Sequence, residues 1–302
     1  MIYASFFFEL GYSGNTLNSM HVLNMSVFET LEISCKDGYS LSGHFYPKQN
    51  SSKNNHPILI CPATGITQYF YQAFAEWLST QGYDVLSFDF RGIGRSLHGP
   101  VSKFEASIIH WGQFDIPAAI DTLLCKTQAE QVILLGHSAG GQLLGIVPNY
   151  QKVAKVIAVS GSTGHVKGLK GKTKLLAPVM FNVIFPLARI TIGMGENLPK
   201  DVAKQWAQFC SKPGYVMNAM GKTVFEDYHA KIDCPITVLW SSDDEIATAA
   251  NVKDLLRLYP NANTQMIELK PQSYNHKAIG HMLMFKKSHQ NLWPVIEQQL
   301  TS

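Results

Sequence analysis

The sequence predicts an α/β domain in which helices flank a mostly parallel sheet. Short apolar runs, typical of strands buried on both faces, recur along the chain and alternate with segments of helical spacing. The most apolar of these runs ends in Gly-His-Ser-Ala-Gly-Gly, residues 136–141, a sharp turn with a serine at its centre. Apolar residues make up 46% of the 302 residues, enough for a large buried core.

The first predicted element is an antiparallel hairpin. Phe28 to Cys35 alternates apolar and polar residues, Asp37-Gly38 supplies a turn, and Tyr39 to Tyr46 alternates again. We expect this hairpin at an edge of the sheet. Residues 1–24 show no clear period. We interpret them either as an irregular leader or as an upstream start added ahead of Met25, and we expect a single domain at 25–302.

A strand, a helix and a second strand follow in close succession. Pro57–Cys61 and Asp84–Phe90 have the buried-strand pattern, and a helix is expected between them from about Tyr69 to Thr80. Short connections predict a right-handed crossover and parallel pairing. A helix from about Phe104 to Cys125 comes next, and Pro117 either kinks it or starts a second helix.

The serine turn predicts a nucleophile. Ser138 lies between Gly136 and Gly140, and glycines at these offsets leave room for a strained backbone. We expect the preceding strand to end at the turn and a helix to begin after it. Such a turn holds a hydroxyl out from the sheet, near the first free N–H groups of a helix.

The regular alternation stops after the strand Val153–Ser160. Residues 162–230 contain prolines, glycines and an apolar run but no strand and helix alternation, so we interpret them as a cap inserted between two strands. The alternation then returns with strands at Pro235–Trp240 and Thr264–Leu269 and helices at Asn251–Tyr259 and Asn291–Leu300.

A serine nucleophile needs a base, which must project from the carboxyl end of a strand. His281 lies in the loop after the last predicted strand, and imidazole exchanges protons near neutral pH. His276 shares that loop and is the main alternative. His137 is expected to pack behind the serine turn.

The base in turn needs an acid that fixes its tautomer. Asp243 and Asp244 both follow the strand that ends at Trp240, and we favour Asp244 because Ile246 supplies an anchor two residues later. Asp243 is interpreted as a solvated turn residue or a helix N-cap. The three residues therefore occur along the sequence in the order serine, acid, histidine, which is the order found in one known fold family.

Backbone N–H groups are expected to stabilise the oxyanion. One belongs to Ala139, directly after the nucleophile. For the other we choose Thr64, in the loop after the Pro57–Cys61 strand, since Pro62 has no N–H.

Flexible apolar side chains in the cap, Met180, Phe181 and Phe185 among them, suggest a hydrophobic or acyl substrate. Packing of the cap onto the sheet explains the same residues equally well.

Composition excludes several classes of function. A net charge of +3, with no basic stripe interleaved with aromatics, does not fit a nucleic-acid-binding protein. No run approaches the roughly 18 apolar residues of a membrane span. The five cysteines form no Cys-x-x-Cys pair, so neither a zinc site nor a disulfide framework is expected, and reduced cysteines fit a cytoplasmic protein. Gly92-Ile93-Gly94 belongs to no phosphate-binding motif. We expect no cofactor or metal, and the oligomeric state stays open.

These motifs together resemble those of the α/β-hydrolase superfamily. Gly-His-Ser-Ala-Gly-Gly, Asp-Phe-Arg-Gly-Ile-Gly-Arg-Ser at 89–96 and Gly280-His281 carry the resemblance from about Phe28 to the C-terminus. Within the superfamily the chain is similar to bacterial predicted hydrolases near serine aminopeptidases and monoacylglycerol lipase-like enzymes. Pro62-Ala63 replaces the His-Gly that such proteins have at the oxyanion loop, so the resemblance supports Thr64 less well than the triad.

The leading hypothesis is therefore a serine hydrolase that cleaves esters of a small-molecule substrate through an acyl-enzyme on Ser138. An acyltransferase or a peptidase would use the same residues. A binding protein on a hydrolase scaffold is a further alternative, but it would not need three intact catalytic partners.

Overall fold

The computed structural model describes residues 27–50, 56–179 and 197–301. One sheet of eight strands runs through this part of the chain in the order β1-β2-β4-β3-β5-β6-β7-β8. The strands are β1 (Glu29–Ser34), β2 (Ser40–Tyr46), β3 (Ile58–Cys61), β4 (Val85–Phe88), β5 (Val132–His137), β6 (Val153–Val159), β7 (Ile236–Ser241) and β8 (Thr264–Leu269). The predicted fold class, an α/β-hydrolase sheet flanked by helices, is confirmed.

Strand directions follow the pattern of the sequence. β1 and β2 form the predicted antiparallel hairpin at one edge, and β2 pairs antiparallel with β4. All pairs from β4 to β8 are parallel. The hairpin turn requires glycine at Gly38, whose φ of 82° lies in the left-handed region.

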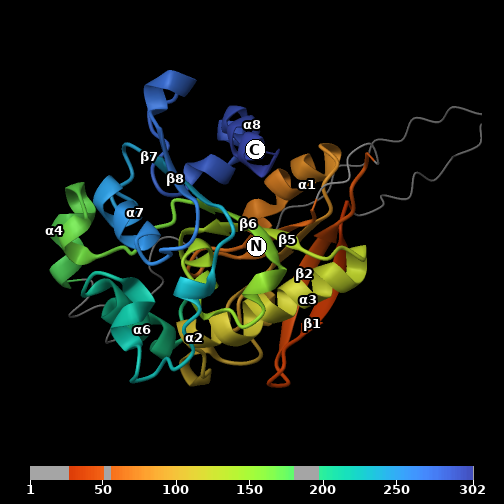
Figure 1. Cartoon of the computed structure of the whole chain (residues 1–302), viewed down its shortest axis with the longest axis horizontal. Coiled ribbons are helices and arrows are strands. Elements are labelled where there is room, and N and C mark those ends of the chain that lie inside the picture. Colours follow the sequence, from red (N-terminus) through yellow and green to blue (C-terminus); the bar gives the residue numbers. More distant parts are fainter. Residues whose placement is uncertain (1–26, 51–55, 180–196, 302) are drawn as a thin grey trace, which may run out of the picture.

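Two hydrophobic clusters lie on the two faces of the sheet, and alternate strand residues enter each. In β3, Leu59 and Cys61 pack into the cluster that contains α3 (Ile116–Thr127). Ile58 and Ile60 pack into the cluster that contains α1 (Gln72–Thr80) and α8 (Trp293–Thr301). Figure 1 shows α1 and α8 side by side, and the rings of Phe74 and Trp293 join them at 5.5 Å.

The helices that frame the sheet are short. They are α1 (Gln72–Thr80), α2 (Ile108–His110), α3 (Ile116–Thr127), α4 (Gly171–Val179), α6 (Lys200–Cys210), α7 (Ala249–Leu256) and α8 (Trp293–Thr301). A π-helical segment, Trp111–Asp115, joins α2 to α3. Pro117 lies in the first turn of α3, so the second of the two expectations for this proline is correct.

The helix predicted after Ser138 is wrong. The chain instead forms short 3₁₀ segments at Ser138–Gly141 and Leu144–Ile146. Gly140, Gly141 and Gly145 disfavour an α-helix by roughly 1 kcal/mol each relative to alanine. Gly145 is also required by packing, since a Cβ there would lie 2.0 Å from Nε2 of His229.

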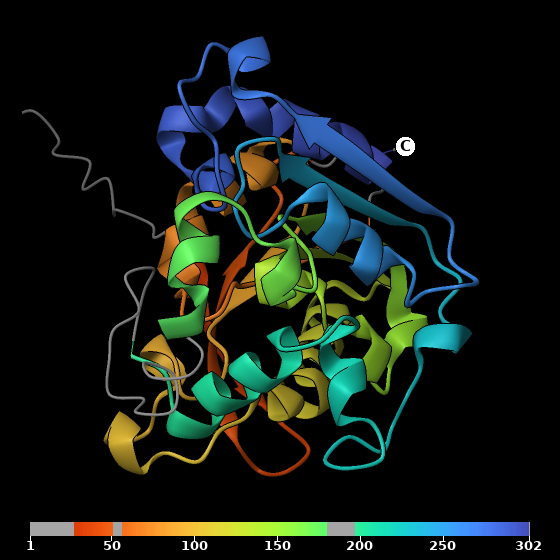
Figure 2. The same ribbon diagram turned by 90° about the vertical axis from the view of Figure 1, so that its left-hand side faces the viewer.

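The segment between β6 and β7 contributes α4 and α6 in its described part. Figure 2 views the molecule from the side on which α4 and α6 lie in Figure 1. α6 contacts α2 where Gln205 accepts a hydrogen bond from the N–H of Ile109 at 3.4 Å.

All five cysteines lie in the described part of the chain and are free thiols there. Across the described ranges, no helix combines the length and the apolar character that a bilayer span requires.

Candidate active site

Ser138 follows directly on β5 and has a strained backbone. Its φ of 48° is unusual for a residue other than glycine. The flanking glycines permit this turn because a Cβ on Gly140 would lie 2.1 Å from the Cys61 carbonyl oxygen, and one on Gly136 would lie 2.4 Å from the backbone of Gly141. The prediction that these glycines are needed for space is confirmed by these contacts.

The structure brings Ser138, His281 and Asp244 into one chain of hydrogen bonds. Nε2 of His281 lies 2.9 Å from Oγ of Ser138, and Nδ1 of His281 lies 2.8 Å from Oδ2 of Asp244. Ser138 directly follows β5, His281 lies in the loop after β8, and Asp244 lies in the loop after β7. All leave the carboxyl ends of parallel strands, where an open α/β sheet places its sites.

Asp244 is buried and held as a carboxylate. Burial alone would raise its pKa, but the charge and hydrogen bond of His281, with the N–H groups of Ala247 and Ile246, outweigh burial and lower the pKa. Oδ1 accepts these N–H groups at 2.9 and 2.8 Å, which leaves Oδ2 for the imidazole. The anchor sought at Ile246 is thus its backbone N–H.

Asp243 has a different task from its neighbour. Its carboxylate accepts the N–H groups of Ile279 at 3.0 Å and Gly280 at 2.9 Å, and also the hydroxyl of Ser241. Burial opposes this charge, but these hydrogen bonds lower the pKa. Of the two interpretations of Asp243, the exposed turn residue is confirmed and the helix N-cap is wrong, since Thr248 caps α7. Asp243 instead ties the loop that carries the histidine to the end of β7.

His276, the alternative base, and His137, which was expected to pack behind the serine turn, make other contacts. His276 bonds to Oδ1 of Asn291 at 2.7 Å and stacks on His289, with ring centroids 3.9 Å apart. His137 is fully buried, and burial together with the charge of His281 lowers its pKa to about 3. Neither imidazole bonds to Ser138.

Thr64 and Ala139 leave neighbouring strand ends at the same offset. Cys61 pairs with Gly136 between β3 and β5, and Thr64 and Ala139 each follow three residues later. Gly65, with a φ of 74°, closes a turn in which the N–H of Ile66 donates to the carbonyl of Ala63. The oxyanion role of both N–H groups stays a prediction.

Glu245 joins the acid loop to α4, a contact that sequence reasoning missed. Its carboxylate accepts the N–H groups of Lys172 at 3.2 Å and Thr173 at 2.8 Å, and so caps the helix. The Thr173 N–H is the largest of the effects that lower the pKa of Glu245. A side chain on Gly171 would collide with this carboxylate, since its Cβ would lie 2.0 Å from Oε1.

Replacing Glu245 by alanine should therefore weaken the docking of α4. We expect the free energy of unfolding to fall by about 1 kcal/mol, as for other lost caps. Because the folded pKa is lowered, this stabilisation is complete above the ordinary value of 4.5 and is lost as the pH falls through the folded pKa. Urea denaturation at neutral and acid pH measures it. Replacing the exposed Glu105 by alanine is the control, and equal losses in both variants would contradict the capping role.

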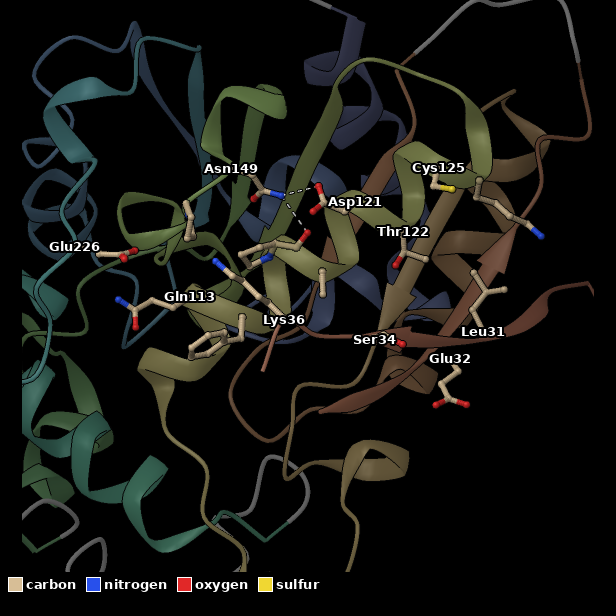
Figure 3. A pocket seen from close by; sticks show the side chains of 15 residues that line it. Leu31, Glu32, Ser34, Lys36, Gln113, Asp121, Thr122, Cys125, Asn149 and Glu226 are labelled. Carbon is tan, nitrogen blue, oxygen red and sulfur yellow. Dashed lines mark hydrogen bonds between the residues drawn. The ribbon is translucent and has the colours of Figure 1, made fainter. Parts of the chain in front are cut away.

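A separate surface pocket of about 820 Å³ lies between β1 and α3 (Figure 3). Asn149 points toward Asp121 there and donates to its Oδ1 at 2.8 Å. None of the predicted catalytic residues lines this pocket, so it is not the catalytic cleft. The predicted substrate residues Met180, Phe181 and Phe185 lie outside the described residues.

Comparison with known proteins identifies the family. The model of the family described as serine aminopeptidase, S33, matches residues 53–274, more than half of the chain. The chain belongs to this family of α/β hydrolases. The predicted superfamily is thereby confirmed.

Curated relatives of this α/β hydrolase include lipases. Lipase 3 of Drosophila melanogaster is 26% identical over 201 residues, which cover 59% of this chain and 50% of the relative. Gastric triacylglycerol lipase of Homo sapiens is 27% identical over 180 residues, which cover 52% and 45%. The chain spans about half the length of these two relatives.

Solved structures share the fold over most of the chain. A soluble variant of monoglyceride lipase from Saccharomyces cerevisiae has a TM-score of 0.66 at 17% identity, covering 94% of this chain and 98% of that one. The Pyrococcus furiosus esterase Pf2001 has a TM-score of 0.62 at 16% identity, covering 91% and 90%. At these identities the likeness concerns the fold.

Proposed function

We propose that this α/β hydrolase cleaves carboxylic esters through an acyl-enzyme on Ser138. The observation that carries the proposal is the hydrogen-bond chain from Ser138 through His281 to Asp244. Nucleophile, base and acid need this geometry, with each bond inside 3 Å, before the hydroxyl can react. The lipases and esterases among the relatives and structural neighbours support the same reaction class.

In the proposed reaction, His281 moves the protons, two backbone N–H groups stabilise the oxyanion, and Asp244 stabilises the imidazolium. Nε2 of His281 takes the proton of Ser138 as its oxygen attacks the ester carbonyl, and the N–H groups of Thr64 and Ala139 stabilise the oxyanion. The protonated histidine then gives its proton to the leaving alcohol. Water, deprotonated by the same imidazole, then attacks the carbonyl of the acyl-enzyme. The bond from that carbonyl to Oγ of Ser138 breaks, the imidazolium returns its proton to Oγ, and the acid is released. Asp244 stabilises the transient imidazolium throughout.

A hydrophobic acyl group is the proposed substrate feature. We keep as proposals the cap at residues 162–230 and a role in acyl binding for Met180, Phe181 and Phe185, which lie outside the described residues. The names of the two curated relatives, both lipases, support an acyl substrate. The family description supports a second candidate, an aminopeptidase, which the same triad could serve.

A panel of p-nitrophenyl esters of increasing chain length and of aminoacyl p-nitroanilides separates these candidates. We expect kcat/KM to rise along the ester series, by up to roughly tenfold for each pair of methylenes that becomes buried, and the anilides to be poor substrates. A preference confined to acetate would contradict the acyl site. Faster cleavage of the anilides than of every ester would replace the esterase by the peptidase.

A further inference from the structure

A second chain of hydrogen bonds lies behind the nucleophile, and the reaction described above does not use it. The N–H of Ala63 lies 2.9 Å from Oη of Tyr71, and that oxygen lies 2.8 Å from Nδ1 of His137. Nε2 of His137 lies 2.9 Å from the backbone carbonyl oxygen of His281. The side chains of Tyr71 and His137 are both fully buried.

The chemistry of the groups fixes every proton in this chain. A carbonyl oxygen only accepts, so Nε2 of His137 carries the proton that bonds to His281. Burial keeps the imidazole of His137 neutral, since it lowers the pKa to about 3, and Nδ1 is therefore an acceptor. Tyr71 must donate its only proton to Nδ1, and its oxygen then accepts the N–H of Ala63. One tautomer satisfies all four groups.

Aromatic packing holds the two rings in place. The ring of Phe285 lies 5.0 Å from that of Tyr71 and 4.9 Å from that of His137. Phe70 stacks on His137 at 6.2 Å. Buried hydrogen bonds without competing water are stiff, and loss of one partner leaves the other unpaired at a cost of about 1–3 kcal/mol.

Each end of this chain adjoins a catalytic segment. Ala63 precedes Thr64, the residue assigned to the oxyanion site, and the far end bonds to the backbone of His281 itself. His137, in the middle, precedes Ser138. This chain of hydrogen bonds therefore joins the loop after β3, the turn after β5 and the loop after β8.

We propose that Tyr71 and His137 are positioning residues that hold the Thr64 N–H at a fixed place relative to the Ser138 and His281 pair. The inference rests on the proposed ester hydrolysis. Donors aimed at an oxyanion act in the transition state, so their displacement lowers kcat and leaves KM almost unchanged.

Tyr71→Phe is the direct test, because it removes only the oxygen that joins Ala63 to His137. We expect kcat for a p-nitrophenyl ester to fall by about tenfold, a fraction of what loss of a whole oxyanion donor costs, while KM stays within about twofold. A trifluoromethyl ketone, which forms a tetrahedral adduct, should bind more weakly by a similar factor. Tyr83→Phe is the matched control: Tyr83 is also buried, and its hydroxyl has no partner among the described residues.

Several results would overturn the inference. It fails if Tyr71→Phe keeps the kcat of the wild type, if it loses no more than Tyr83→Phe, or if KM alone changes. Hydrolysis that survives Ser138→Ala would instead refute the proposed function. If Tyr71→Phe does not fold, ¹⁵N NMR of the histidines in the wild type decides. His137 should show the Nε2–H tautomer at neutral pH. An Nδ1–H tautomer or an imidazolium would contradict the proposed chain of hydrogen bonds from Ala63 through Tyr71 and His137 to His281.

Discussion

Replacing Ser138 by alanine should lower kcat for ester hydrolysis by on the order of 10⁵-fold or more, because loss of a serine nucleophile disables the whole triad. A fluorophosphonate probe should label the wild type and leave Ser138→Ala unlabelled. The fold should persist, since alanine keeps the short side chain that the turn accommodates.

Ser160 provides a matched control for this experiment. It follows β6 as Ser138 follows β5, it also has a positive φ, 53°, and its buried hydroxyl has no partner among the described residues. Ser160→Ala should keep its labelling and activity. Equal labelling of wild type and Ser138→Ala would assign the reactive group to another residue.

The second large effect separates the two neighbouring aspartates. Asp244→Asn should lower kcat by about 10⁴-fold. An amide facing Nδ1 of His281 can donate its N–H there, which moves the imidazole proton to Nε2. The base then donates to Ser138 and can no longer accept its proton.

Asp243→Asn removes the same charge one residue earlier and is the control. Its main effect should be on stability, about 1–3 kcal/mol, because an amide nitrogen would face the N–H of Ile279 or Gly280. We expect kcat to fall by less than about tenfold. Steady-state kinetics and urea denaturation on both variants measure the contrast. A reversed order of the two kcat values would exchange the roles of the aspartates.

The sequence was most informative where local pattern and topology agree. Apolar runs such as Val132–Leu135 predict buried strands. Parallel pairing of these strands then places their carboxyl ends at the same edge of the sheet. Ser138, Asp244 and His281 follow three of those ends, so their convergence could be anticipated from chain order and strand position. The hairpin and its turn could be predicted equally well, because the alternation of apolar and polar residues and the Asp-Gly pair are local signals.

Other features depend on contacts that no local pattern reveals. The helix expected after Ser138 was wrong because Gly140 and Gly145 serve close approaches to Cys61 and His229, segments remote in the sequence. Likewise, the backbone N–H groups that bond to Asp243 and Glu245 lie at least 36 and 72 residues away, respectively. The sequence alone does not distinguish two adjacent aspartates. Their roles differ because different groups of the folded protein pack against each carboxylate.

The acyl-enzyme itself is the most direct test of the proposed reaction. Wild type mixed with a p-nitrophenyl ester and quenched in acid within the first turnovers should gain the mass of one acyl group. Digestion should place it on the peptide that contains Ser138. Ser138→Ala should gain no such mass. An acyl group on another residue, or ester hydrolysis that proceeds with no covalent adduct at any time point, would contradict the account.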